Sequence, residues 1–181
     1  REALKRRIQG VAGEAREGGM LFFYFSGHGV MQGDELCLVP WDGDEKTGIP
    51  FSFVMREWKN SRAGDKIIVI DACRSSAEKA AVIVVPSLRV QSDVAVFLSC
   101  STGEKSYPLD LGGTESAYTH YFTRSLADMA QDPSGKITAR SLHAYIEEAM
   151  SDWRLTTGKN QKPVLVIQGE GDVTFVPARE P

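Results

Sequence analysis

The stretch Phe23-Tyr-Phe-Ser-Gly-His-Gly29 decides the fold, because within it an apolar run gives way at once to small and polar residues. The apolar run begins at Met20, and its unbroken hydrophobic character is typical of a strand that is buried on both faces of a sheet. We therefore expect a strand over residues 20–25 that ends at Ser26. The glycines beyond it allow the backbone to approach a bound molecule closely.

Two further apolar runs end in the same way, in a cluster of polar residues. Lys66–Ile70 is followed by Asp71-Ala-Cys73, and Val94–Ser99 is followed by Cys100-Ser-Thr-Gly103. Because the carboxyl ends of parallel strands meet at one edge of a sheet, the three polar clusters are expected to converge there. This edge is where open α/β folds bind their ligands.

The remaining segments alternate between helical and extended patterns. Helical periodicity covers residues 2–17, 50–60, 117–129 and 138–150, and short extended segments cover residues 36–39, 164–167 and 173–176. Strands that alternate with helices predict an α/β domain with a mostly parallel central sheet and helices on both faces.

Length and composition fit one globular domain over residues 1–181. The chain has a mass of 19.9 kDa, is 42% hydrophobic and carries a formal net charge of −3. The absence of a basic excess argues against nucleic acid and anionic membranes as partners, and the apolar runs are too short to span a bilayer. Three cysteines argue against a disulfide framework, so we expect a reducing, cytoplasmic setting.

His28 and Cys73 are the residues of this pattern that can carry chemistry. They are 45 residues apart in the sequence, yet they follow strands whose ends converge. A cysteine beside a histidine can be held as a thiolate, which is its nucleophilic form. Backbone N–H groups beside the glycines can stabilise an oxyanion. The alternative is structural: a histidine in a turn, and a cysteine that packs as a small apolar residue.

The other two cysteines have a structural interpretation. Cys37 alternates with leucines in an apolar strand and Cys100 follows a buried strand, so both are expected to pack in or beside the core. A zinc site formed by the three cysteines and a histidine is disfavoured, because no two cysteines have the paired C-x₂-C spacing.

At these residues the sequence resembles the caspase-like cysteine peptidases, in particular their metacaspase and bacterial orthocaspase branch. The matching motifs are Phe23–Gly29 and Ile68-Val-Ile-Asp-Ala-Cys-Arg74, in the order and near the histidine-to-cysteine spacing of the family. Later landmarks agree, including Ser99–Ser106 and Gln161-Lys-Pro163, so the resemblance covers nearly the whole chain. It implies a caspase-like α/β fold.

The resemblance implies a cysteine endopeptidase with a Cys–His dyad. Cys73 would attack the scissile carbonyl carbon and form an acyl-enzyme, and His28 would protonate the leaving amine. The backbone N–H groups of Gly29 and Cys73 would form the oxyanion hole. This chemistry requires no cofactor.

The resemblance also implies specificity for basic residues. Asp71 occupies the position at which caspases that cleave after Asp carry Gln, and a carboxylate there selects a cation. Ser26 matches the pocket serine of the family, and Ser106 and Tyr107 are not followed by the arginine of the caspase substrate loop. Together with Ser101 they form the expected substrate-binding set, which predicts cleavage after Arg, then Lys.

The chain departs from the family pattern at both its start and its middle. It lacks the first strand of the family, and residues 77–93 are expected to link a large-subunit-like part to a small-subunit-like part. Arg74, Lys79 and Arg89 are candidate self-cleavage points for an enzyme that cuts after basic residues.

Calcium is an optional ligand in this interpretation. Metacaspases often bind activating calcium through an acidic cluster, but here the extended acidic run is missing. Asp42 and Asp44 are the candidate ligands that remain.

Family members of this type imply a regulated bacterial effector of stress, defence or cell death that acts on protein or peptide substrates. An upstream activating protease or a regulatory domain would switch it, and a monomer is favoured over a dimer. One alternative is a catalytically silent caspase-fold scaffold or regulator, although such proteins usually lack a dyad residue and both are present here. Another is a separase-like or gingipain-like peptidase with the same dyad.

Overall fold

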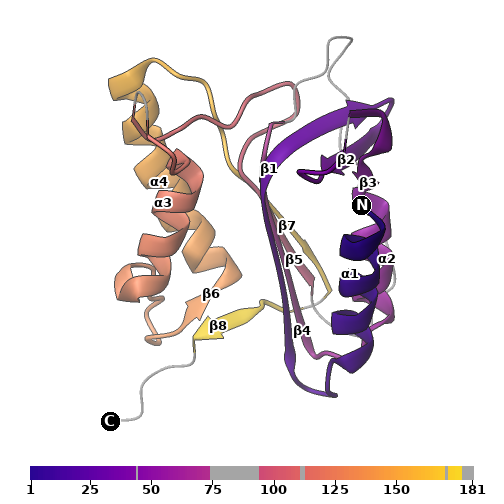
Figure 1. Cartoon of the computed structure of the whole chain (residues 1–181). Helices are drawn as coiled ribbons and strands as arrows, with labels where there is room; N and C mark the ends of the chain where they lie inside the picture. The colour runs from indigo at the N-terminus through magenta and orange to yellow at the C-terminus, as the bar shows by residue number, and fades with distance from the viewer. Residues whose placement is uncertain (44, 74–93, 111–112, 170, 177–181) are drawn as a thin grey trace.

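A six-stranded mixed sheet lies between two pairs of helices in the computed structural model (Figure 1). The structure describes residues 1–43, 45–73, 94–110, 113–169 and 171–176. The helices are α1 (Glu2–Glu14), α2 (Phe51–Asn60), α3 (Ala117–Arg124) and α4 (Ala139–Thr157), with the short helical turns η1 (Glu45–Thr47) and η2 (Ser125–Met129). The strands are β1 (Met20–Gln32), β2 (Glu35–Val39), β3 (Ile49–Pro50), β4 (Asp65–Ala72), β5 (Val94–Leu98), β6 (Ile137–Thr138), β7 (Val164–Gln168) and β8 (Thr174–Val176).

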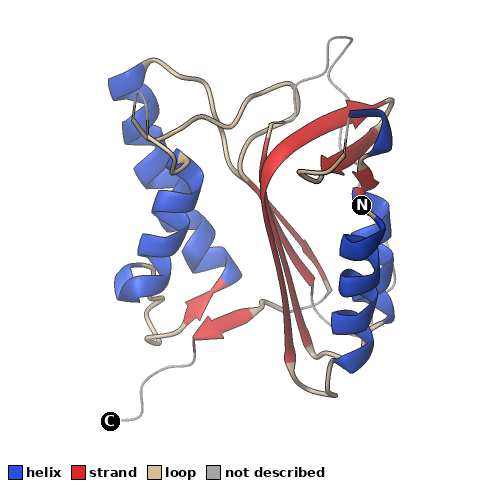
Figure 2. Cartoon of the chain, viewed as in Figure 1, coloured by secondary structure: helices blue, strands red, loops and turns tan. Residues whose placement is uncertain are grey.

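The main sheet has the strand order β3-β2-β1-β4-β5-β7. Strands β1, β4 and β5 are parallel neighbours at its centre, whereas β2, β3 and β7 run antiparallel to their neighbours at the two edges. Strands β6 and β8 form a separate two-stranded sheet. Figure 2 shows helices on both faces of the main sheet, which confirms the predicted α/β fold with its parallel centre.

Two hydrophobic cores flank the main sheet, and β4 contributes to both. Ile68 and Ile70 face the core that lies under α1 and α2. Ile67 and Val69 face the core that lies under α3 and α4. These side chains are at most 1% exposed. Because both faces of the strand are covered, an unbroken apolar run is the pattern that this position requires.

Strand β1 is longer than the sequence predicts. The expected end at Ser26 is wrong, because the strand continues through His28 to Gln32. After leaving β4 it pairs with β2 in an antiparallel hairpin that turns at Gly33, whose φ of 61° favours glycine. The ladder is formed by backbone groups, so small and polar side chains do not end it.

Three helices also differ in length from the prediction. The helix expected over residues 2–17 ends at Glu14. The helix expected over residues 117–129 ends at Arg124 and continues as a π-helical turn. Helix α4 extends past the predicted end at Met150, because Trp153 continues its buried face. It ends at Gly158, whose φ of 70° gives the left-handed C-cap that glycine adopts without strain.

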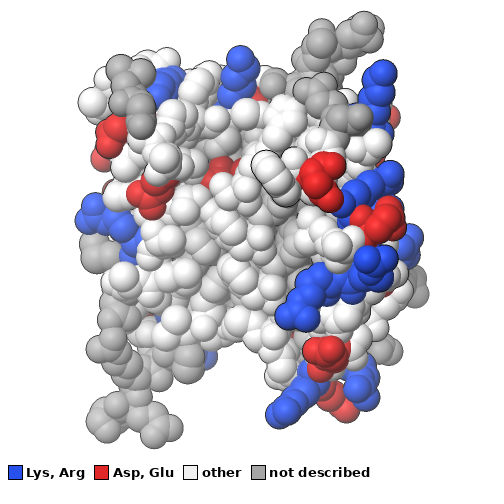
Figure 3. Space-filling model, viewed as in Figure 1, with Lys and Arg blue, Asp and Glu red and all other residues white. Residues whose placement is uncertain are grey.

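Charged side chains of both signs are interspersed on the face that Figure 3 shows, most densely over α1 at the right of the view. They do not form a patch of one sign on this face. Within the described residues, no helix combines the length and the apolar character that crossing a membrane requires. The expected linker over residues 77–93 lies outside the described residues.

Candidate active site

Strand pairing brings the two sequence motifs side by side. In the parallel register of β1 and β4, Ser26 lies opposite Asp71. His28 and Cys73 directly follow the last pair of this ladder, Gly27 and Ala72, so the register brings their backbones close together at the carboxyl end of β4. Since side chains alternate along a strand, Ser26 and His28 are on the sheet face of Asp71, which is the face under α3 and α4.

Gly29 is required where β1 passes the end of β4. A Cβ atom at this position would lie 2.7 Å from the carbonyl oxygen of Cys73 and 2.9 Å from the Cβ of Ala72. The lack of a side chain lets the backbone after His28 pack directly against the backbone of Cys73. This is the close backbone approach for which glycine is suited.

The Cys73 side chain lies at the boundary between interior and solvent. It is half-buried, whereas His28 is exposed. The thiol of Cys73 donates a weak hydrogen bond to the carbonyl oxygen of Ser106, with 3.7 Å between the two atoms. The sulfur therefore faces the loop that follows β5.

A cavity of about 250 Å³ opens beside Cys73. Its lining contains five residues that the sequence singled out, namely Ser26, Asp71, Cys73, Ser106 and Tyr107. Four further lining residues were not predicted, namely Gly27, Pro108, Thr114 and Ser116. The structure thus places the expected nucleophile and the expected specificity carboxylate on the wall of one cavity.

Asp71 is the charged group of this wall, and it is only 3% exposed. Its Oδ1 accepts a hydrogen bond from the hydroxyl of Ser106 at 2.6 Å. Its Oδ2 accepts hydrogen bonds from the hydroxyls of Ser116 and Thr119, both in the first turn of α3 or just before it. A buried carboxylate needs such donors to offset the loss of its water shell.

Two tyrosines lie behind Asp71 and remain neutral. The hydroxyl of Tyr24 is hydrogen-bonded to the hydroxyl of Thr119. Burial is the main cause that raises the pKa of Tyr24, and the charge of Asp71 raises it further against the lowering effect of the Thr119 hydrogen bond. Burial and the same carboxylate raise the pKa of Tyr118 well above its usual value. Neither phenol group therefore adds a negative charge beside Asp71.

Gln161 holds the loop that covers Asp71, and sequence reasoning assigned it no role beyond a family landmark. Its side chain is fully buried. The carbonyl Oε1 accepts from the backbone N–H of Tyr107 at 2.8 Å, and Nε2 donates to the carbonyl oxygen of Ser99 at 3.0 Å. Nε2 also donates to the hydroxyl of Ser106 at 3.2 Å. No local sequence pattern announces these contacts, because they join segments that are more than 50 residues apart.

Ser101, expected in the substrate-binding set, is not among the residues that line the cavity. Its hydroxyl donates to the carbonyl oxygen of Lys162 at 3.2 Å. Glu104 holds the same turn, since its Oε2 accepts from the backbone N–H groups of Ser101 and Lys162. The side chain of Ser101 therefore links the loop after β5 to the segment before β7.

The two remaining cysteines are buried, as predicted. Cys37 is 1% exposed in β2, and burial raises the pKa of its thiol. Cys100 is fully buried, and its thiol approaches the carbonyl oxygens of Ala72 and Glu104 at 3.4 and 3.5 Å. Cys73 is thus the cysteine with an accessible side chain.

The predicted calcium ligands do not form a cluster in the part of the chain that the structure describes. Asp42 is exposed. Asp44 lies outside the described residues. Among the described side chains, no group of three His, Cys, Asp or Glu residues could hold a metal ion.

The candidate self-cleavage points Arg74, Lys79 and Arg89 all lie outside the described residues.

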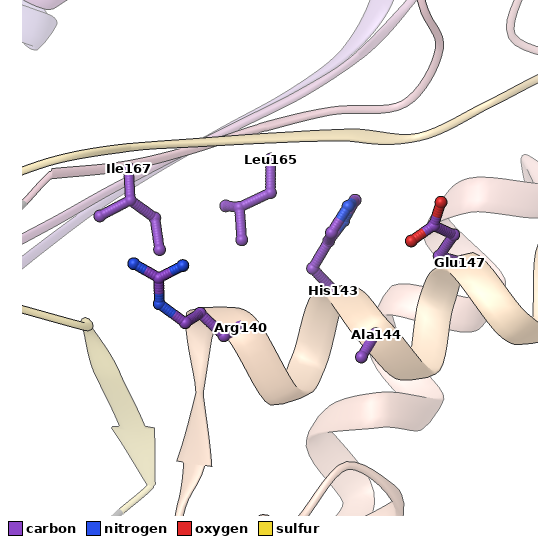
Figure 4. Close-up of a pocket in the computed structure, with 6 residues that line it drawn as sticks. All are labelled: Arg140, His143, Ala144, Glu147, Leu165 and Ile167. Atoms are coloured by element: carbon purple, nitrogen blue, oxygen red, sulfur yellow. The ribbon is translucent and has the colours of Figure 1, made fainter.

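A second, larger cavity of about 400 Å³ lies between α4 and β7 (Figure 4). Arg140, His143 and Glu147 from α4 face the apolar side chains of β7 across it. Burial lowers the pKa of His143, and its buried Nδ1 has no hydrogen-bond partner among the described residues. No thiol or hydroxyl group is among the described residues that line it.

Comparison with known proteins bears on the family and the fold of the chain. No curated protein matches the chain in sequence. Among solved structures, the crystal structure of protein GSU0716 from Geobacter sulfurreducens is similar, with a TM-score of 0.66 and 15% identity. The match covers 95% of this chain and 74% of that protein, and at this identity it shows a shared fold alone. The model of the caspase domain matches residues 1–170. By that match over most of its length, the chain belongs to the caspase domain family of cysteine peptidases.

Proposed function

We propose that the chain is a cysteine endopeptidase of the metacaspase-like branch that cleaves proteins after basic residues, Arg before Lys. The observation that carries the proposal is the joint placement of Cys73 and the buried carboxylate of Asp71 on one cavity wall. The nucleophile and the specificity group are then within reach of one substrate residue.

In the proposed reaction His28 takes the thiol proton of Cys73. The thiolate sulfur bonds to the scissile carbonyl carbon, and the carbonyl oxygen becomes an oxyanion. As the C–N bond breaks, His28 gives its proton to the leaving amine. A water molecule, deprotonated by His28, then attacks the thioester, which releases the acid product and the free thiol.

The backbone N–H groups of Gly29 and Cys73 are the proposed oxyanion donors. The contact between the two backbones supports this assignment, since a side chain at Gly29 would collide with the carbonyl group of Cys73. Loss of one such donor typically reduces the rate about 10²- to 10³-fold.

Asp71 is the proposed selector of a cationic substrate side chain. Its charge is nearly out of solvent, where electrostatic attraction is stronger than in water. The two tyrosines near Asp71 remain neutral, so the proposed attraction rests on the carboxylate of Asp71. A Lys or Arg side chain that enters the cavity therefore gains a partner that a neutral or acidic side chain does not.

We further propose that the enzyme is a monomeric, regulated bacterial effector, switched by an upstream protease or a regulatory domain. Support for this part is the family resemblance of the motifs. A catalytically silent scaffold remains the alternative function, and the presence of both His28 and Cys73 favours the enzyme.

The test is hydrolysis of fluorogenic peptides that differ only in Arg, Lys or Asp before the scissile bond. We expect turnover of the Arg and Lys peptides, no turnover of the Asp peptide, and loss of activity in Cys73→Ala. Cys37→Ala is the matched control, because that thiol is buried in the core. Turnover of the Asp peptide would contradict the proposed specificity, and activity that persists in Cys73→Ala would contradict the proposed nucleophile.

A further inference from the structure

We propose that the hydroxyl of Ser116 blocks the second carboxylate oxygen of Asp71 from the cavity and thereby limits the preference of the pocket for Arg over Lys. This inference rests on the proposed cleavage after basic residues, and it names a residue that sets how strongly the pocket prefers Arg over Lys. Ser116 precedes α3, and sequence reasoning did not single it out.

Asp71 has few acceptor positions left for a substrate side chain. An ionised carboxylate offers about four lone-pair positions, two on each oxygen. Within the described residues, Ser116 and Thr119 both donate to Oδ2, and Ser106 donates to Oδ1. Oδ2 is therefore fully occupied, and one acceptor position is left on Oδ1.

The hydroxyl groups around Asp71 point their hydrogens at its carboxylate. The Ser116 oxygen already accepts from the backbone N–H of Thr119 at 2.9 Å, and the Ser106 oxygen accepts from Gln161 at 3.2 Å. Their hydrogens are thus free to point at Asp71. Thr119 donates to the carboxylate as well, so it is Tyr24 that donates to Thr119. Each donor is held in place by a second partner, which makes the arrangement hard to displace.

The two hydroxyl groups that donate to Oδ2 lie differently relative to the cavity. Ser116 and Asp71 both line it, whereas Thr119 does not. The Oδ2 position occupied by Ser116 is therefore the one that faces an entering side chain, and the position occupied by Thr119 lies behind. Removal of the Ser116 hydroxyl opens Oδ2 to the cavity, and removal of the Thr119 hydroxyl does not.

The consequence differs for the two basic side chains. A guanidinium group gains most from a bidentate contact, which needs both carboxylate oxygens. An ammonium group is a point charge that needs one acceptor and can donate its other hydrogens elsewhere. With only Oδ1 open, Arg loses the second hydrogen bond that would separate it from Lys. The wild-type pocket is thus expected to prefer Arg by a small margin.

The test compares kcat/KM for two peptides that differ only in Arg or Lys before the scissile bond. Ser116→Gly removes the hydroxyl, and glycine is tolerated as a helix N-cap. The ratio of Arg to Lys turnover is expected to rise roughly tenfold, the worth of one additional charge-assisted hydrogen bond. Thr119→Val is the matched control, because it removes a donor to the same oxygen from the side away from the cavity. It is expected to change both turnover rates by the same factor.

The preference for Arg over Lys is also measured as binding affinity, so that the test of this proposal does not depend on catalysis. Dissociation constants of Arg and Lys peptide amides are measured by NMR titration in a Cys73→Ala background, with and without Ser116→Gly. A tenfold rise in the affinity ratio supports the proposal even if the wild-type protein hydrolyses nothing, in which case only the proposed activity fails. The proposal would be overturned if the ratio of Arg to Lys affinities is unchanged in folded Ser116→Gly, or if Thr119→Val changes that ratio by as much as Ser116→Gly does. It would also be overturned if neither peptide binds.

Discussion

Replacement of Asp71 by Asn separates charge from shape at the proposed specificity site. The side chain keeps its size, but the negative charge is removed from a position that is only 3% exposed. A hydrogen bond to a charged group contributes about 1.5–3 kcal/mol, so a cationic substrate is expected to lose roughly 10- to 150-fold in kcat/KM. A peptide with norleucine at the same position has no charge to lose, and its slow turnover is expected to change little.

Asn also disturbs the donors around it, which the assay must take into account. Its amide nitrogen cannot accept a hydrogen bond, so either Ser106 or the pair of hydroxyls on Oδ2 must reorient. Asp65→Asn, at the opposite end of β4, is the matched control for loss of one acidic charge from this strand. The assay is kcat/KM for Arg, Lys and norleucine peptides, together with a thermal melt. Arg turnover within twofold of wild type in folded Asp71→Asn would refute the assigned role of the carboxylate.

Three further predictions concern the supports of the site and the second cavity. Gly29→Ala places a methyl group 2.7 Å from the carbonyl oxygen of Cys73, so peptide turnover is expected to fall at least 10²-fold. Gly10→Ala is the control and is expected to retain wild-type turnover, because the space around Gly10 is open. Equal turnover rates for the two variants would contradict the argument from close packing at Gly29. Gln161→Leu leaves the buried backbone partners of the Gln161 amide unpaired, which is expected to lower the free energy of unfolding by about 1–3 kcal/mol for each group. Chemical denaturation measures this loss. An unchanged denaturation midpoint would show that other contacts hold the loop. Because burial lowers the pKa of His143, the unfolded chain binds a proton that the folded chain does not as pH falls below 6.5, so the stability of the folded state decreases with falling pH. The Tm of His143→Gln should therefore decrease less than that of the wild type between pH 7 and pH 5. Parallel curves of Tm against pH for the two proteins would contradict this prediction.

The sequence predicted the part of the site that lies at the ends of buried strands. Asp71 and Cys73 follow the apolar run of β4, and Ser26 and His28 follow the apolar part of β1. Parallel pairing brings such ends together, so the topology alone makes these residues neighbours. The strand directions at the edges of the sheet were harder to predict. The apolar run of β7 indicates a strand, but it does not indicate whether that strand runs parallel or antiparallel to β5.

The residues that hold the site were not predicted, because their roles depend on contacts between distant segments. Ser116 and Thr119 have the composition of an ordinary helix start, and Gln161 is a polar residue in a loop. Only the folded arrangement shows that the hydroxyls of Ser116, just before α3, and Thr119, in its first turn, reach Asp71 across 45 and 48 residues of sequence. Hydroxyl and amide side chains serve many structural purposes, and nothing local in the sequence distinguishes these from the others.

The most direct test of the account is covalent labelling with a peptidyl-arginine acyloxymethyl ketone, followed by peptide mapping in a mass spectrometer. The thiolate displaces the carboxylate leaving group and forms a thioether, so the label marks the nucleophile that lies beside the bound arginine. The account predicts one label, on Cys73, which is strongly reduced in Asp71→Asn and absent from the buried Cys37 and Cys100. Labelling of Cys73 that is equally fast with an aspartyl reagent, or folded protein that takes up no label, would contradict the account.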